Sequence, residues 1–188
     1  MSDSEKEREF DFKAHEQAAV AKYLTRLGFY GELSRVVKRI LEESLKRRGI
    51  KVHSVEARAK DPTSFGRKAG QPSEADPTKP RYQDPLKQIT HLAGVRIIAY
   101  FPSTLAQIDE LLGGEFKIVE RSDKGAELIE EDRVGYQSIH YLVELTPERA
   151  RLPEYGPFGS AVAEIQIRTI MQHAGPKLST TSSTSLLR

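Results

Sequence analysis

Val95-Arg-Ile-Ile-Ala-Tyr-Phe101 is a short, mostly apolar run that ends at Pro102. Its length and its β-branched and aromatic residues predict a β-strand. The stretch Ile50–Lys60 instead alternates polar and apolar residues, which indicates a strand with one polar face. We therefore expect 95–101 to lie nearer the centre of a sheet than 50–60.

Three further segments with strand character follow along the chain: Phe116–Glu120, Tyr136–Leu145 and Ala161–Arg168. A helix is predicted from Ser103 to Leu112, and Gly113-Gly114 should end it. This order of elements predicts an α+β fold, with a mixed or antiparallel five-stranded sheet and flanking helices.

Apolar residues recur at helical spacing before the first strand, between His15 and Leu45. Because Gly28 and Gly31 interrupt the pattern, it fits either two helices or one kinked helix. Gly49 follows as a helix-ending residue. We expect a flexible terminus over 1–12 and a helical element over 13–49 that packs on the sheet.

Length and composition exclude several classes of protein. The 188 residues suffice for one medium domain, and the net charge of +2 favours no particular partner. The absence of cysteine excludes disulfides, thiolate metal sites and cysteine nucleophiles, and it fits a cytoplasmic location. Since no run approaches the roughly 18 apolar residues of a membrane span, we expect no membrane partner.

Two segments are predicted to be irregular. Residues 69–85 contain four prolines among polar residues, and a loop of this length is a candidate flap. After Ala174 the chain enters Gly175-Pro176 and a Ser/Thr-rich run without a packing period. That composition predicts a disordered tail over 175–188.

A first group of polar residues surrounds the end of the 50–60 strand. Arg58 and Lys60 share a strand face, and a helix beginning near Ser64 would bring Arg67 and Lys68 round within one turn. Several cations beside a helix N-terminus predict a polyanion site. A solvated basic rim is an equally good interpretation of the spacing alone.

Two later strands carry polar residues at alternate positions. Tyr136, Ser138 and His140 fall on one face of the fourth strand, where an aromatic ring could stack on a base. In the fifth strand, Glu164 shares a face with Gln166 and Arg168, and an acid there requires a cationic or metal partner. The alternative for the Tyr136 strand is an ordinary cross-strand ladder, and the alternative for Glu164 and Arg168 is a surface ion pair. Together the polar strand faces predict one wet, charged surface.

Four segments in this order resemble the synthetase domain of RelA/SpoT-type alarmone synthetases. They are Arg58-x-Lys60-x3-Ser64-x3-Lys68, Ile89-Thr-His-Leu-Ala-Gly-Val-Arg-Ile-Ile98, Gly135-Tyr-Gln-Ser-Ile-His140 and Glu164-Ile-Gln-Ile-Arg-Thr169. The resemblance covers residues 50–174, and the helical region before it resembles the N-terminal part of stand-alone small alarmone synthetases. It implies a nucleotidyltransferase-like fold and a GTP pyrophosphokinase, which transfers the β,γ-pyrophosphate of ATP to the 3′-hydroxyl of GDP or GTP. A homo-oligomer is compatible with it.

The resemblance also implies roles for individual residues and Mg²⁺ as the cofactor. The ATP phosphates would be held by Arg58, Lys60, Ser64 and Lys68. Tyr136 would stack on the acceptor guanine, with His140 and Arg133 near its phosphates. Glu164 would bind Mg²⁺ or help to activate the 3′-hydroxyl, and Gln166 and Arg168 would support it.

The chain departs from the family pattern in three places. His91 stands where the family has the principal Mg²⁺-binding aspartate, and an imidazole is a poor ligand for this hard ion. Arg133-Val134 replaces the usual Lys and Asn before the stacking tyrosine. After His173-Ala174 the family continues a helix that covers the sheet, whereas this sequence enters its Ser/Thr tail. We expect weak or absent synthesis and lower stability.

Two alternative functions remain open. The chain could be a catalytically silent nucleotide-binding relic or regulator, which His91 and the tail favour. It could instead resemble toxin-like transferases that move pyrophosphate to the 3′ end of tRNA, which Arg133-Val134 and the basic stretch Lys46–Lys51 favour.

Overall fold

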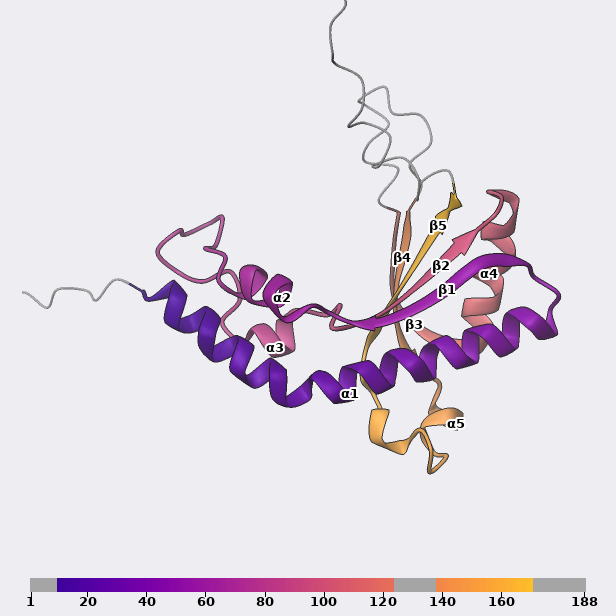
Figure 1. Cartoon of the computed structure of the whole chain (residues 1–188), viewed down its shortest axis with the longest axis horizontal. Helices are drawn as coiled ribbons and strands as arrows, with labels where there is room; N and C mark the ends of the chain where they lie inside the picture. Colours follow the sequence, from indigo (N-terminus) through magenta and orange to yellow (C-terminus); the bar gives the residue numbers. More distant parts are fainter. Residues whose placement is uncertain (1–9, 124–137, 171–188) are drawn as a thin grey trace, which may run out of the picture.

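The computed structural model describes residues 10–123 and 138–170 (Figure 1). Most of the predicted flexible terminus, the start of the fourth predicted strand and the tail over 175–188 lie outside these residues. Arg133, Val134 and Tyr136 lie outside them as well.

Six helices and five strands form the described chain. In order they are α1 (Phe12–Arg47), β1 (Val52–Ala59), α2 (Pro62–Ala69), α3 (Pro85–Gln88), β2 (Ala93–Ala99), α4 (Ser103–Glu115), β3 (Phe116–Asp123), β4 (Ile139–Leu145), α5 (Pro147–Ala150), the short 3₁₀ helix η2 (Gly156–Phe158) and β5 (Ala163–Thr169). The strand order is β1-β2-β5-β4-β3. β2 and β5 are parallel and every other pair is antiparallel, so the predicted α+β fold with a mixed five-stranded sheet is confirmed.

The sheet has one apolar and one polar face. Residues at alternate positions of β2, β4 and β5 are buried in a single core with α1 and α4. The intervening positions carry the polar residues. In the strand register, Gly94 of β2 lies between Arg58 of β1 and Glu164 of β5. Gln166 of β5 likewise lies between Arg96 of β2 and His140 of β4. Polar residues from four strands therefore meet on the face opposite this core.

α1 is one long helix that packs against β1 and β2 and bends partway along its length (Figure 1). Of the two predicted alternatives, the kinked single helix is the one observed. It ends at Arg47, and Gly49 follows the C-cap with a φ of 67°, in the left-handed region that glycine favours. Ile50 N–H donates to the Leu45 carbonyl at 2.9 Å and Gly49 N–H to the Lys46 carbonyl at 3.1 Å, a Schellman motif.

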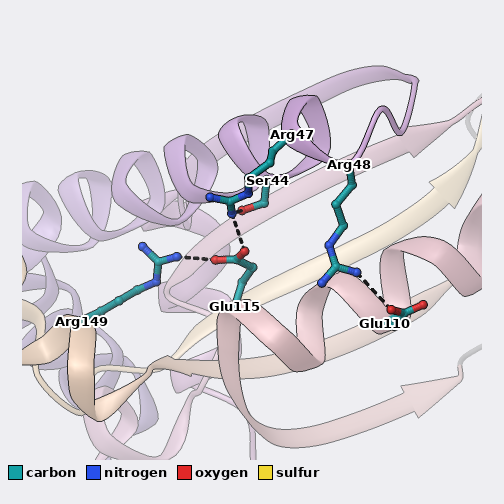
Figure 2. Close-up of polar contacts among 6 residues, drawn as sticks. All are labelled: Ser44, Arg47, Arg48, Glu110, Glu115 and Arg149. Atoms are coloured by element: carbon teal, nitrogen blue, oxygen red, sulfur yellow. Dashed lines mark hydrogen bonds and ion pairs between the residues drawn. The ribbon is translucent and has the colours of Figure 1, made fainter.

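The predicted end of α4 at Gly113-Gly114 is wrong, because both glycines lie inside the helix. The helix continues to Glu115, whose carboxylate is held by two arginines from other elements (Figure 2). Arg47 of α1 lies 2.7 Å from one carboxylate oxygen, and Arg149 of α5 donates to the other. These charge-assisted contacts join three helices and favour the additional helical residues.

Replacing Glu115 with Gln is expected to lower the free energy of unfolding by about 1–3 kcal/mol at neutral pH, because charge-assisted hydrogen bonds are lost at a side chain that is 12% exposed. Burial raises the pKa of Glu115, but Ser44, Arg149 and Arg47 more than offset this and hold it below its usual value. The ionised form therefore stabilises the fold above the ordinary glutamate pKa, and this stabilisation is lost as the pH falls through the lower folded value.

The measurement is urea denaturation of the parent and E115Q at several pH values. The matched control is E110Q, which alters the ion pair between Glu110 and Arg48 (Figure 2). Because the Glu110 side chain is 81% exposed, the free energy of unfolding is expected to change by only about 0–1 kcal/mol. An equal loss in both variants, or a difference that grows toward acidic pH, would contradict the assignment.

A second core joins α1 to α2, away from the sheet. It consists of Ala19, Tyr23, Phe65, Ala69, Ile89 and Leu92. The rings of Tyr23 and Phe65 stack with centroids 4.5 Å apart. The Tyr23 hydroxyl donates to the Lys60 carbonyl at 2.6 Å, and burial is the main cause that raises the pKa of Tyr23 to about 12. The second core thus fixes the chain on both sides of Asp61.

Gly66 allows α2 to approach α1 closely. A Cβ at this position would lie 2.7 Å from Val20 Cγ2 and 2.9 Å from Glu16 Oε1. We expect Gly66→Ala to cost about 1–3 kcal/mol by overpacking, measured by thermal and urea unfolding. Gly28→Ala is the control, because nothing lies within 4 Å of its added Cβ and a gain of about 0.5–1 kcal/mol is expected. A neutral effect at Gly66 would show that α2 is not held in contact with α1.

Candidate functional site

A hollow opens on the polar face of the sheet, between the end of β1, the start of α2 and strand β5. Its lining is polar and comes from distant parts of the chain: Glu56, Arg58, Lys60, Asp61, Ser64, His91, Gly94, Val95, Arg96, Glu164 and Gln166. Gly94 lies between Arg58 and Glu164 in the strand register and leaves the floor open because it has no side chain. The structure therefore brings together residues from three of the sequence segments singled out above.

The cationic side of the hollow is shaped by the turn from β1 into α2. Asp61 caps the helix, because its carboxylate accepts from Ser64 N–H at 2.8 Å, and Pro62 occupies the first turn. The hydrogen bonds with Ser64 hold the pKa of Asp61 below its usual value. α2 begins one or two residues earlier than predicted and carries Arg67 and Lys68 in its last turn.

A second hollow adjoins the first and shares Lys60 and Ser64 with it. Its remaining lining is Arg67, Lys68, Gln71, Arg81 and Tyr82. The latter two belong to the predicted irregular loop, which is anchored where the Tyr82 carbonyl lies 2.8 Å from His15 Nε2. Sequence reasoning missed Arg81 and Tyr82, although a basic residue beside an aromatic one in a proline-rich loop was a usable signal.

The cations of the two hollows influence one another. Burial lowers the pKa of Lys60, and the charges of Lys68 and Arg58 lower it further, while Glu164 opposes them. Because like charges repel, the cationic form of Lys60 is partly disfavoured. A polyanion bound among these side chains would relieve the repulsion.

On the opposite side of the first hollow, Glu164 accepts hydrogen bonds through both carboxylate oxygens. His140 Nδ1 lies 2.8 Å from Oε1 and Gln166 Nε2 lies 3.1 Å from Oε2. His140 Nε2 in turn lies 2.9 Å from Ser138 Oγ, which accepts from Arg168 Nε at 3.3 Å. Burial would raise the pKa of Glu164, but the hydrogen bond and charge of His140 outweigh it and keep the group ionised.

A family model described as "Region found in RelA / SpoT proteins" matches residues 57–182, which is most of the chain. The chain belongs to the RelA/SpoT family. No curated protein sequence matches it.

Solved structures of small alarmone synthetases share the fold of this RelA/SpoT chain. Small alarmone synthetase 1 from Bacillus subtilis bound to its product pppGpp is 23% identical, with a TM-score of 0.60 over 84% of this chain and 79% of that one. The same enzyme bound to AMPCPP is 20% identical, with a TM-score of 0.54 over 84% and 75%. Small alarmone synthetase 2 from the same organism is 23% identical, with a TM-score of 0.57 over 83% and 77%.

The residues of this RelA/SpoT chain do not fit the Mg²⁺ site that the resemblance implies. Lys68 Nζ donates to His91 Nε2 at 2.9 Å, which occupies the lone pair that a metal would need. Burial lowers the pKa of His91 and the charge of Lys68 lowers it further, so the imidazole is neutral. Within residues 10–123 and 138–170, no three His, Asp or Glu side chains are arranged to hold a metal ion.

The remaining predicted residues are placed as follows. His140 and Arg168 lie on the polar face, tied to Glu164 through the hydrogen bonds above. Arg96 lines the hollow beside Gln166, and Arg96 Nε and Gln166 Oε1 are buried without a hydrogen-bond partner among the described residues. The predicted roles of Tyr136 and Arg133 stay predictions.

None of the described helices is both long enough and apolar enough to span a lipid bilayer.

Proposed function

We propose that this RelA/SpoT chain binds ATP and a guanine nucleotide and transfers pyrophosphate between them, as a (p)ppGpp synthetase with low activity. The observation that carries the proposal is the first hollow, where Arg58 and Lys60 face the ionised Glu164 across the open floor at Gly94. Cations on one side suit the phosphates of the donor, and a carboxylate on the other suits the hydroxyl of the acceptor. Small alarmone synthetase 1 from Bacillus subtilis has been solved with its product pppGpp and with AMPCPP bound, which supports these substrates.

The proposed reaction forms a bond between the 3′ oxygen of GDP or GTP and the β-phosphorus of ATP. The bond from that phosphorus to the α,β-bridging oxygen breaks, and AMP leaves. Arg58, Lys60, Ser64 and Lys68 hold the donor phosphates, and Glu164, oriented by His140, accepts the proton of the 3′-hydroxyl. Phosphoryl transfer depends on such positioning and charge stabilisation more than on covalent catalysis. In this proposal the acceptor nucleotide is also bound by Tyr136, Arg133 and Arg168.

Low activity follows from His91. The family's carboxylate at this position is replaced by a neutral imidazole that accepts a hydrogen bond from Lys68. Metal ions contribute several kcal/mol to transition states of this kind, and each 1.4 kcal/mol is about a tenfold change in rate. A synthetase without that contribution is expected to be slower by orders of magnitude. We also propose a cytoplasmic location, where these nucleotides occur.

The test is incubation of the protein with ATP and either GDP or GTP, followed by chromatography of the nucleotides. Slow formation of AMP together with an equal amount of ppGpp or pppGpp is expected. E164Q should abolish this product. Circular dichroism must show that the variant is folded, because the substitution also removes the charge of a side chain that is 16% exposed and accepts hydrogen bonds from His140 and Gln166. Product formation that is equal in the parent and E164Q would overturn the assignment of Glu164.

A second candidate is a nucleotide-binding protein without transferase activity. The hydrogen bond between Lys68 and His91 favours it, because the substitution leaves the cationic hollow intact while removing a carboxylate. This candidate predicts that calorimetry detects ATP binding while no product forms over long incubation. Failure to bind either nucleotide would exclude both functions.

A further inference from the structure

We propose that this site recognises nucleoside triphosphates in their metal-free form, because the Lys68 ammonium group, which is hydrogen-bonded to His91, takes the place of a divalent cation. This inference rests on the nucleotide binding proposed above and adds the ionic form of the ligand.

The geometry places a protein cation at the junction of the two hollows. Lys68 Nζ lies 2.9 Å from His91 Nε2, and His91 lines the first hollow together with Glu164. Lys68 itself lines the second hollow together with Arg67 and Arg81. Its ammonium group can thus neutralise a phosphate bound in either hollow. A carboxylate in place of His91 would instead attract a metal ion to this point.

The charges of the hollows match a strongly anionic ligand. His91, which stands where the family has an aspartate, lines the first hollow without adding a negative charge. The cationic side chains that line the two hollows are Arg58, Lys60, Arg67, Lys68, Arg81 and Arg96, and the acidic ones are Glu56, Asp61 and Glu164. A metal-free triphosphate carries more negative charge than its Mg²⁺ complex. An excess of cations therefore favours the metal-free form.

The acidic side chains of the hollows already have partners in the protein. Both oxygens of Glu164 accept hydrogen bonds, Asp61 caps α2, and Glu56 lies 4.0 Å from Arg96. A divalent ion carried in with the phosphates would have to break these contacts and would meet Lys68 at close range. Repulsion between the ion and the ammonium group opposes binding of the Mg²⁺ complex.

The experiment is calorimetric titration of the full chain with ATP, once in EDTA and once with Mg²⁺ in excess over ATP, at matched ionic strength. We expect the parent to bind ATP about tenfold more tightly in EDTA, a preference set by the local charge balance. H91D is expected to reverse the order, since the added carboxylate pairs with the ion. K68M should lose the preference for metal-free ATP and bind weakly in both buffers. E110Q, which lies outside both hollows, should behave as the parent does.

The outcomes separate the two claims. ATP binding by the parent that is equal in both buffers, or tighter with Mg²⁺, overturns this inference and leaves the proposed function standing. Absence of ATP binding in both buffers overturns the proposed function. Far-ultraviolet circular dichroism of each variant shows whether it is folded, and if H91D does not fold, the comparison between the parent and K68M decides the inference alone.

Discussion

His91→Asp is expected to raise the rate of (p)ppGpp synthesis with Mg²⁺ by about a hundredfold or more, the largest gain in activity that the structure predicts. The variant places a carboxylate in the hollow that Glu164 also lines, and it replaces the imidazole nitrogen that now accepts from Lys68. Two carboxylates supply the hard oxygen ligands that Mg²⁺ prefers. The measurement is the initial rate of AMP formation from ATP and GTP.

The matched control is His91→Asn, which also shortens the side chain but adds no charge. We expect no gain in this variant. Equal rates in the parent and H91D would show that position 91 is not where the metal of the active family members binds. A gain in both variants would assign the defect to the size of the imidazole instead of its charge.

Phe65→Ala is expected to lower the free energy of unfolding by about 3–5 kcal/mol, the largest effect on stability. Phe65 is fully buried and stacks on Tyr23 in the second core, so its truncation leaves a cavity between α1 and α2. Urea denaturation followed by circular dichroism measures the loss. Phe101→Ala removes the same atoms from a residue that is 66% exposed, and a change within about 0.5 kcal/mol is expected.

The same variant connects stability with binding. Ser64 and Lys68 flank Phe65 on α2, so a loosened α2 should also weaken ATP binding under native conditions. Phe65→Leu, which keeps most of the buried volume, should restore much of the loss in both quantities. Normal ATP affinity in a destabilised F65A protein would show that α2 does not position the side chains proposed to bind the ATP phosphates.

Local patterns predicted most of the secondary structure but not the arrangement of the strands. Alternation identified β1 and β5, and Gly49 correctly marked the end of α1. The position of β5 at the centre of the sheet depends on pairing with β2 and β4, which are distant in sequence, and no local pattern carries that information. Gly113-Gly114 misled the prediction because the contacts of Glu115 outweigh intrinsic propensity.

The candidate site was predictable to a similar extent. Alternation correctly placed Arg58, His140 and Glu164 on polar strand faces, and the register brings those faces together. The contact between Lys68 and His91 was not predictable, because it joins a helix to a loop 23 residues later. The sequence showed that the family's aspartate is missing, and only the structure shows which group takes its place.

The position of β5 also has a consequence for how the protein forms during translation. Arg58 and Lys60 are synthesised early, whereas Glu164 belongs to β5, the last described strand, which must insert between β2 and β4. Until that insertion the edges of β2 and β4 are unpaired, and such edges can pair with other chains and cause aggregation. In the proposed function both sides of the nucleotide site exist only after this strand has inserted, so a ligand that contacts both sides would stabilise the finished fold.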